Sequence, residues 1–223
     1  MKKIDKIMRE KDDLENNIVS KRGTRDGYEI EKGVVLNESF LKEHFDEIGE
    51  ALNIWTAYPD IYLDCIKPED SNFELFFYQR ITLRSIMRYK DIYITAPRAF
   101  SKSFITILGL ILQCIFIPGT KRFICAPNKI QSAQIAKEKI VEIYDRWPLL
   151  KKEVIGGDVT DTPGNFGKDY VTLKFRNGSQ FDVVGALDSQ RGGRRSGGLI
   201  DEVREICIKN IDLSFIIFTY IYN

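Results

Sequence analysis

Residues 96–104, APRAFSKSF, place a lysine and two hydroxyls between two apolar runs of the chain. The run before them, 91–95, has the length of a short strand, and the run from Ile105 onward has the length of a helix. A loop that binds nucleotide phosphates needs this order, with a lysine for the β- and γ-phosphates and a hydroxyl for Mg²⁺ in the first helical turn. Lys102 and Ser103 are therefore candidates for binding phosphate and Mg²⁺.

The loop departs from the glycine-rich Walker A pattern at both glycine positions. Counting back from Lys102, Ala96 stands at the first of these positions and Ser101 at the second. Backbone that approaches a phosphate often needs a positive φ, which costs a residue other than glycine about 1 kcal/mol, and serine tolerates that cost. An ordinary helix start, with Ser101 as the cap and Lys102 in solvent, is the alternative. The predicted nucleotide-binding residues of the loop are Ala96, Pro97, Arg98, Ala99, Phe100, Ser101, Lys102 and Ser103.

Two adjacent carboxylates, Asp201 and Glu202, follow the apolar residues Leu199 and Ile200 further along the chain. An ATPase with a phosphate-binding loop uses such a pair at the end of a strand, where the Asp holds Mg²⁺ through water and the Glu polarises the attacking water. We predict these roles for Asp201 and Glu202. A plain strand end is the alternative.

Gln79 lies shortly before the first predicted strand. Its carboxamide offers a donor and an acceptor together, which suits both the amino group and a ring nitrogen of adenine. Motor ATPases place a glutamine at this position, and we predict that Gln79 contacts adenine. A solvated helix residue is the alternative.

The composition of the chain argues against several classes of site. With 223 residues, 43% of them hydrophobic, the chain is long enough for one sizeable α/β domain. The net charge of +1 gives no global attraction to nucleic acid, so any contact with a polyanion must be local. A single histidine, His44, argues against a zinc cluster or a histidine-based triad.

Targeting signals and membrane segments are not recognisable in the sequence. The amino-terminal residues are charged throughout, and no apolar run is long enough to cross a bilayer. The four cysteines are far apart, never occur in C-x-x-C spacing, and in three cases lie within apolar runs, which is typical of buried thiols in a reducing compartment. We therefore expect a soluble, cytoplasmic protein without membrane partners.

From residue 73 the sequence alternates between strand and helix patterns. The expected elements are a helix at 73–89, a strand at 91–95, a helix at 102–115, a strand at 121–126 and a helix at 128–146. This alternation predicts right-handed β-α-β units on a mostly parallel sheet. Two alternating runs, 170–176 and 180–184, flank Asn177-Gly178, which predicts a hairpin. Helical spacing of apolar residues behind Asn37-Glu38-Ser39 predicts a helical appendage before the sheet.

These motifs follow the order found in one family. The segments FFYQRITLRSIMRYKDIYITAPRAFSKSF, RFICAPNKIQSAQIAKEKI and GALDSQRGGRRSGGLIDEV, between residues 76 and 203, resemble the ATPase domain of the large terminase subunit of tailed phages. The resemblance implies an α/β fold of the helicase-like P-loop NTPase class, with helices on both faces of the sheet. It also implies ATP and Mg²⁺ as ligands, and ATP hydrolysis that drives packaging of double-stranded DNA into a capsid.

The resemblance assigns roles to arginines as well. The family typically keeps an arginine four residues before the lysine, and Arg98 stands at that position. The resemblance implies that Arg98 stabilises charge on the γ-phosphate, so Arg98 and Glu202 are the predicted catalytic residues. A similar arginine-rich stretch precedes the acidic pair in the family, matched here by RGGRRSGG at 191–198, which is predicted to be a flexible basic loop. We expect this loop to contact phosphates of DNA or of a neighbouring subunit's nucleotide, and a merely solvated loop is the alternative.

The resemblance ends after Val203, and it divides the chain into three regions. We predict an appendage at 1–57, an incomplete P-loop ATPase domain at 58–206 and an atypical apolar tail at 207–223. Family members continue with a coupling motif and a nuclease domain, which we expect to be missing here through truncation or a frameshift. The tail is expected to form an edge strand or to remain exposed.

The family also implies partners, and other functions stay open. Beside DNA, the implied partners are the small terminase subunit, the portal protein and further copies of this chain. One alternative is an inactive remnant that folds or binds nucleotide without turnover. Another is a different nucleic-acid-dependent P-loop ATPase, such as a helicase.

Overall fold

The computed structural model describes residues 42–97, 100–126, 128–157, 160–185, 195–200 and 216–221, with the backbone alone for residues 126, 185 and 216–221. The chain divides into two compact units, Met1–Trp55 and Thr56–Asn223. Most of the helix α3 (Phe45–Ala57) belongs to the first unit, and its first turn carries Asp46 and Glu47, which suit the positive end of the helix dipole. The helix predicted here from apolar spacing is present from Phe45 onward.

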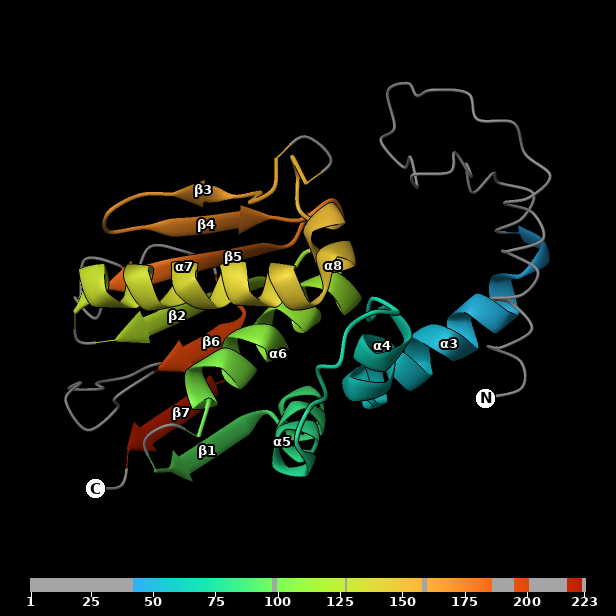
Figure 1. Ribbon diagram of the computed structural model, residues 1–223, viewed down its shortest axis with the longest axis horizontal. Coiled ribbons are helices and arrows are strands. Elements are labelled where there is room, and N and C mark those ends of the chain that lie inside the picture. Colours follow the sequence, from blue (N-terminus) through green and yellow to red (C-terminus); the bar gives the residue numbers. More distant parts are fainter. Residues whose placement is uncertain are drawn as a thin grey trace. The chain divides into compact units, whose positions relative to one another are not determined.

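The second unit is built around a mixed seven-stranded sheet (Figure 1). Its strands are β1 (Asp91–Ala96), β2 (Lys121–Ala126), β3 (Asn165–Phe166), β4 (Val171–Lys174), β5 (Gln180–Gly185), β6 (Gly197–Ile200) and β7 (Ile216–Ile221). They follow the spatial order β1-β7-β6-β2-β5-β4-β3. The strands β1, β7, β6, β2 and β5 run parallel, and β4 and β3 at one edge run antiparallel, which confirms the predicted mostly parallel sheet.

The apolar tail does not form the edge strand that the sequence predicted. Its strand β7 lies inside the sheet and pairs in parallel with β1 on one side and with β6 on the other. Ala96 faces Ile221 in the first ladder, and Ile200 faces Phe218 in the second. The edge-strand prediction was wrong because strand order depends on contacts that are distant in sequence, whereas the composition of 216–221 indicates only that these residues form a strand.

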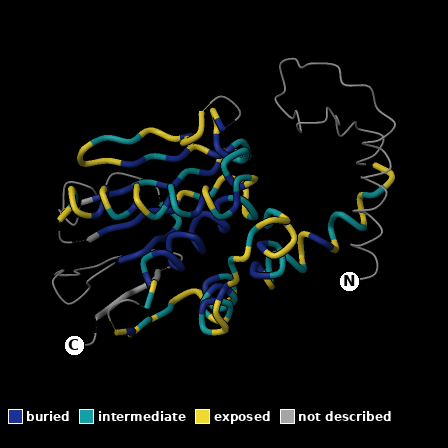
Figure 2. Tube along the Cα trace, viewed as in Figure 1, coloured by how far each residue is buried: buried dark blue, intermediate teal, exposed yellow. Residues whose placement is uncertain are grey.

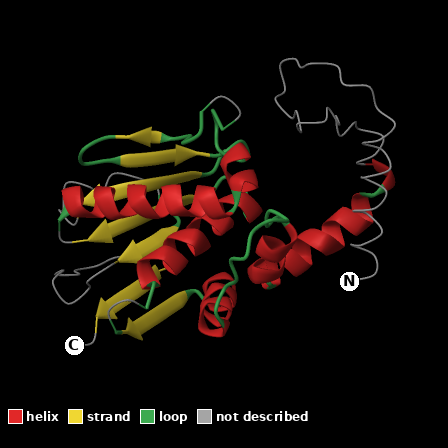
Figure 3. Ribbon diagram, viewed as in Figure 1, coloured by secondary structure: helices red, strands yellow, loops and turns green. Residues whose placement is uncertain are grey.

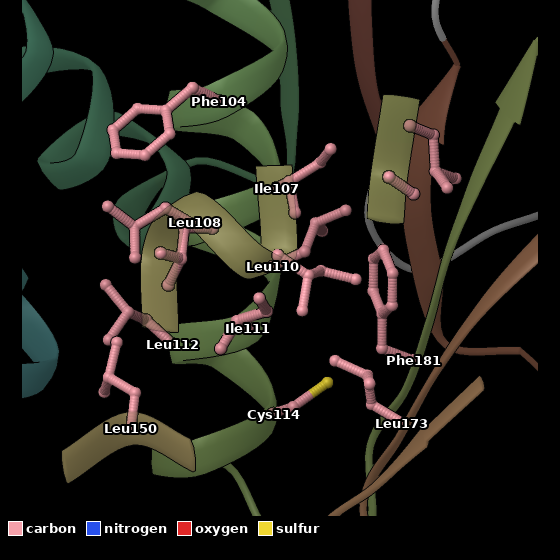
Figure 4. Packing of buried hydrophobic residues seen from close by; sticks show 14 of the residues in the cluster. Phe104, Ile107, Leu108, Leu110, Ile111, Leu112, Cys114, Leu150, Leu173 and Phe181 are labelled. Atoms are coloured by element: carbon pink, nitrogen blue, oxygen red, sulfur yellow. The ribbon is translucent and has the colours of Figure 1, made fainter. Parts of the chain in front are cut away.

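Two long helices, α6 (Lys102–Phe116) and α7 (Lys129–Arg146), pack side by side on one face of the sheet (Figures 1 and 3). α6 is apolar around its circumference and is buried almost throughout (Figure 2). Figure 4 shows Leu110 and Cys114 of α6 facing Phe181 and Leu173 of the sheet. Apolar as α6 is, no helix in the described ranges has the length and hydropathy of a membrane span.

The two faces of the sheet differ. On the face toward α6 and α7, Ile124 of β2 and Phe181 of β5 belong to the main hydrophobic core. On the other face, Phe123, Cys125 and Val184 form a separate small cluster of buried residues. The residues that link β5 to β6 and β6 to β7 lie largely outside the described ranges. The described helices α6 and α7 cover one face of the sheet. Helices on the other face stay a prediction.

Charged side chains join α4 (Pro59–Cys65) to α5 (Phe77–Arg88). The buried Asp60 carboxylate accepts hydrogen bonds from Arg84, at 2.8 Å from Nε and 2.6 Å from Nη2, and from Arg80 Nη1 at 3.4 Å. Burial by itself raises the pKa of Asp60, but the hydrogen bonds and positive charge of Arg84 outweigh it, so this pKa lies below its usual value. The pair fixes α4 against α5.

The hairpin predicted at Asn177-Gly178 joins β4 to β5 and also ends α6. Gly178 has a φ of 82°, a conformation that glycine adopts without strain. The Asn177 side-chain amide donates hydrogen bonds to the carbonyls of Cys114 and Ile115, at 2.8 and 2.9 Å. The last carbonyls of a helix have no partner inside the helix, and Asn177 satisfies two of them. The antiparallel edge of the sheet therefore anchors the carboxyl end of α6.

We expect Asp60→Asn to lower the free energy of unfolding by about 1–2 kcal/mol near neutral pH, because Arg84 loses a charged acceptor. A carboxyl whose pKa is lowered by folding stabilises the native state above its unfolded-state pKa of about 4, and this contribution is lost as the pH falls through the folded-state pKa. The stabilities of the wild type and Asp60→Asn should therefore converge below about pH 4. Urea unfolding curves at several pH values measure both effects.

Asp64→Asn is the matched control, because the Asp64 carboxylate also belongs to α4 and accepts a hydrogen bond from Arg80, but its side chain is 45% exposed. We expect little change in the free energy of unfolding from this substitution. A gap between wild type and Asp60→Asn that stays constant through the acidic range would contradict the role given to the Asp60 carboxylate.

Candidate nucleotide-binding site

The carboxyl end of β1 leads into the predicted phosphate-binding loop. Ala96 is the buried last residue of β1, Pro97 is exposed, and Phe100 is half-buried. α6 begins at Lys102, so the predicted order of strand, loop and helix is present. The loop follows the carboxyl end of a parallel strand, and the carboxyl ends of the strands are where open α/β sheets bind ligands.

Ser101 has the conformation that the missing glycine predicted. Its φ is 54° and its ψ 27°, and among the described residues it is the one non-glycine residue with a positive φ. Its side chain makes no capping hydrogen bond to α6, so an ordinary serine cap is not what starts this helix. The left-handed conformation costs about 1–2 kcal/mol, and strain of this kind concentrates at functional sites.

Lys102 occupies an environment that favours an anion. It is the first residue of α6 and only 8% of it is exposed, so the alternative of a solvated lysine is wrong. No residue of the described ranges forms an ion pair with Lys102, and the first turn of α6 contains no acidic residue. A buried ammonium at the positive end of a helix dipole is stabilised by negative charge placed beside it.

The first turn of α6 is held together by a threonine. The Thr106 hydroxyl donates hydrogen bonds to the carbonyl of Lys102 at 2.8 Å and to that of Ser103 at 3.2 Å. Ser103 is half-buried in this turn, next to Lys102. The predicted ligands of phosphate and Mg²⁺ are therefore adjacent on a turn that is internally bonded.

Gln79 has a structural role that the sequence did not predict. It is 3% exposed, and its Oε1 accepts a hydrogen bond of 3.0 Å from the backbone N–H of Phe76, the residue that caps α5. A glutamine three residues into a helix can reach back to the first N–H in this way. A contact of Gln79 with adenine stays a prediction. Because Oε1 already accepts the hydrogen bond from Phe76, the Nε2 amide is the group left for such a contact.

Aromatic rings connect Gln79's helical turn to the loop. The rings of Tyr78 and Phe100 are stacked with their centroids 4.0 Å apart, and Phe76 stacks on Tyr78 at 5.8 Å. This contact is not predictable from the sequence, because Tyr78 and Phe100 are 22 positions apart and belong to different elements. The run of aromatics in FFYQ was the available signal.

Several predicted site residues lie outside the described ranges: Arg98, Ala99, Asp201 and Glu202. Ile200, the last described residue of β6, directly precedes the acidic pair. β7 lies between β6 and β1, so β6 is two strand spacings, about 10 Å, from the strand that carries the loop. In the described ranges no group of three His, Cys, Asp or Glu residues is placed to hold a metal, and the predicted Mg²⁺ ligand Asp201 is not among them.

The end of RGGRRSGG is part of the sheet. Gly197 and Gly198 begin β6 and are buried, so the prediction of a flexible loop up to residue 198 was wrong there. A Cβ on Gly198 would lie 2.3 Å from the carbonyl oxygen of Phe123, which explains the glycine. Just before β6, the Ser196 carbonyl accepts a hydrogen bond from Arg122 Nη1 at 2.9 Å. Residues 195–198 lie at the amino end of β6, and the candidate loop follows the carboxyl end of the parallel strand β1, so the two are at opposite ends of the strands. Residues 191–194 lie outside the described ranges.

Comparisons with known proteins bear on the fold. No protein-family model and no curated protein sequence matches this chain. Among solved structures, the large terminase of bacteriophage HK97 matches with a TM-score of 0.53 and 13% sequence identity, over 74% of this chain and 37% of its own. The chain shares its fold with part of a phage large terminase. The resemblance predicted from the motifs is thus confirmed at the level of the fold.

Two other terminase structures match with lower TM-scores. The large terminase of a thermophilic bacteriophage has a TM-score of 0.49 and 10% identity, over 66% of this chain and 39% of its own. The large terminase ATPase domain of Thermus phage P74-26 has a TM-score of 0.43 and 18% identity, over 63% of this chain and 60% of its own. The chain thus covers less than two thirds of each of these three structures.

We expect Ser101→Gly to raise the free energy of unfolding, by up to about 1 kcal/mol, because glycine adopts a positive φ without strain. Ser101→Val should have the opposite effect, since a β-branched residue is poorly tolerated there. Thermal unfolding of both variants measures the difference. A glycine variant less stable than wild type would show that the serine hydroxyl, rather than the backbone, is what this position requires.

Proposed function

We propose that this chain is a P-loop ATPase that binds Mg·ATP through residues 96–103. The observation that carries the proposal is the pair Ser101 and Lys102. Ser101 has a left-handed backbone conformation, and Lys102 follows it at the start of α6. Lys102 is buried and forms no ion pair with any residue of the described ranges. Polyphosphate is the ligand whose charge matches this arrangement, because its negative charge is stabilised by both the ammonium and the helix N–H groups.

The residues have separate roles in the proposed reaction. Lys102 binds the β- and γ-phosphates, and the Ser103 hydroxyl and Asp201 hold Mg²⁺. Bound Mg²⁺ neutralises charge on the phosphates. Glu202 accepts a hydrogen bond from the attacking water and orients it, and Arg98 stabilises the charge that develops on the γ-phosphate. Gln79 contacts adenine through its amide.

The order of the strands supports this assignment of the acidic pair. Ile200, the last residue of β6, lies at the same end of the parallel strands as Ala96, the last residue of β1. The intervening β7 puts a space of about 10 Å between β6 and β1, and we propose that Mg²⁺ and the phosphates bind at this end of the two strands. An adjacent strand would leave only about half that space.

The fold shared with a phage large terminase supports a proposal for the process that ATP hydrolysis drives. We propose that the chain acts as the motor domain of a terminase large subunit, in the host cytoplasm and transiently on the procapsid, where ATP hydrolysis is coupled to packaging of double-stranded viral DNA into a capsid. Its proposed partners are DNA, the small terminase subunit, the portal protein and further copies of the chain. The shared fold with the HK97 large terminase supports this, and it spans 37% of that protein.

Two lysines provide a matched test of ATP binding. Lys102 is the first residue of α6 and Lys129 is the first residue of α7, and each helix follows a parallel strand. Lys129 is paired with Asp169 at 3.1 Å, whereas Lys102 has no such described partner. We expect Lys102→Ala to weaken binding of a fluorescent ATP analogue at least about 100-fold, and Lys129→Ala to leave it unchanged. Equal affinity of a folded Lys102→Ala variant would refute the proposed site.

The acidic pair provides the test of turnover. Asp201→Ala should weaken Mg²⁺-dependent binding, whereas Glu202→Gln should leave ATP bound but not hydrolysed. Hydrolysis is measured at high protein concentration with and without double-stranded DNA, because neighbouring subunits contribute to motor sites. If the wild type binds Mg·ATP but turns it over no faster than Glu202→Gln, the chain is a nucleotide-binding module without ATPase activity.

A further inference from the structure

We propose that the stacked rings of Tyr78 and Phe100 hold the phosphate-binding loop in its binding conformation. The two residues would then set the affinity for the phosphates of a nucleotide and not for its base. This inference rests on the proposed function, because it concerns the same loop. The first turn of α5, which carries Tyr78, would then position the loop as well as contact the base.

The helical turn that carries Tyr78 is fixed on several sides. Gln79 caps the backbone N–H of Phe76 at 3.0 Å, and the Phe76 ring stacks on Tyr78 with an angle of 8° between the ring planes. Arg80, in the same turn, donates through Nε to the Leu75 carbonyl at 3.3 Å and through Nη2 to Asp64 at 3.0 Å. A ring mounted on this turn is therefore a rigid support for whatever stacks against it.

The phosphate-binding loop, which carries Phe100, contains strained backbone that needs support. Phe100 directly precedes Ser101, whose φ of 54° is a strained conformation for a residue with a side chain. Strained backbone persists only where surrounding contacts determine it. The Ser101 side chain makes no capping hydrogen bond to α6. The neighbouring Phe100 is held by its stack on Tyr78, whose ring centroid lies 4.0 Å away.

The alternative is that these rings form a platform for adenine. The Phe76 ring is 64% exposed and lies next to the turn of Gln79, so a base has access to it. The two interpretations differ in one measurable respect. A ring that touches the base changes the affinity for nucleotides only, whereas a ring that shapes the loop changes the affinity for a ligand without a base as well.

The experiment compares Mg·ATP with inorganic tripolyphosphate as ligands of the full chain, by competition against a fluorescent ATP analogue. We expect Tyr78→Leu to weaken both by the same factor, about three- to tenfold, because an aromatic pair is lost. Tyr78→Phe keeps the ring and should restore both affinities. The double variant Tyr78→Leu/Phe100→Leu should be no weaker than the single variants, because both remove the same contact.

Phe77→Leu is the matched control, since Phe77 belongs to the same helical turn, is 78% exposed and takes no part in the stack. It should leave both affinities unchanged, and thermal unfolding of each variant confirms that it is folded. Weaker binding of ATP with unchanged binding of tripolyphosphate would overturn the inference in favour of base contact. Unchanged binding of both ligands would overturn it as well. Failure of the wild type to bind either ligand would instead refute the proposed nucleotide site itself.

Discussion

The burial of α6 is the constraint on which the rest of this structure depends. Nearly every residue from Lys102 to Cys114 is buried, so the helix has one position between the sheet and its neighbouring helices. Two of its polar side chains donate to backbone carbonyls: the Thr106 hydroxyl to a carbonyl of its own helix, and Gln113 Nε2 to that of Ile86 at 2.9 Å. The Gln113 Oε1 atom is buried without a hydrogen-bond partner in the described ranges. Because the helix cannot shift, its first turn and Lys102 are held at the end of β1.

The close approach of α5 to α6 extends this constraint to the segment before β1. At Gly109 an added Cβ would lie 2.8 Å from the Ile86 side chain, so the two helices touch where α6 has no side chain. α5 is in turn tied to α4 through Asp60 and Arg84. The turn that carries Tyr78 and Gln79 thus belongs to the same packed unit as Lys102. Strain at Ser101 is tolerated between two supports that are both fixed.

Local sequence patterns predicted the elements of this unit well. The strand at 121–126 was predicted at its observed bounds, and the helices α6 and α7 within a residue at each end, because apolar spacing and helix-start residues are local signals. Asn128 illustrates this, since its side chain accepts hydrogen bonds from the N–H groups of Ile130 and Gln131 and begins α7. The positive φ at Ser101 was likewise predictable from the spacing to Lys102.

Features that depend on long-range contacts were missed. The position of β7 between β1 and β6 follows from pairing with residues far away in sequence, and nothing in IIFTYI distinguishes an interior strand from an edge strand. The stack of Tyr78 on Phe100 was missed for the same reason. The cap of Gln79 on Phe76 is local, and it was missed because the helix was predicted to begin at residue 73 rather than at Phe77. Gly198 was assigned to a flexible loop because a glycine required by close backbone approach looks the same in sequence as one that confers flexibility.

A crystal structure of the chain grown with Mg²⁺ and a non-hydrolysable ATP analogue would show whether the loop between β1 and α6 binds nucleotide phosphates. We expect the β- and γ-phosphates within hydrogen-bond distance, about 3 Å, of Lys102 Nζ and of the backbone N–H groups at the start of α6. A nucleotide bound at another edge of the sheet, or a Lys102 ammonium paired with a carboxylate of the protein instead of a phosphate, would contradict it.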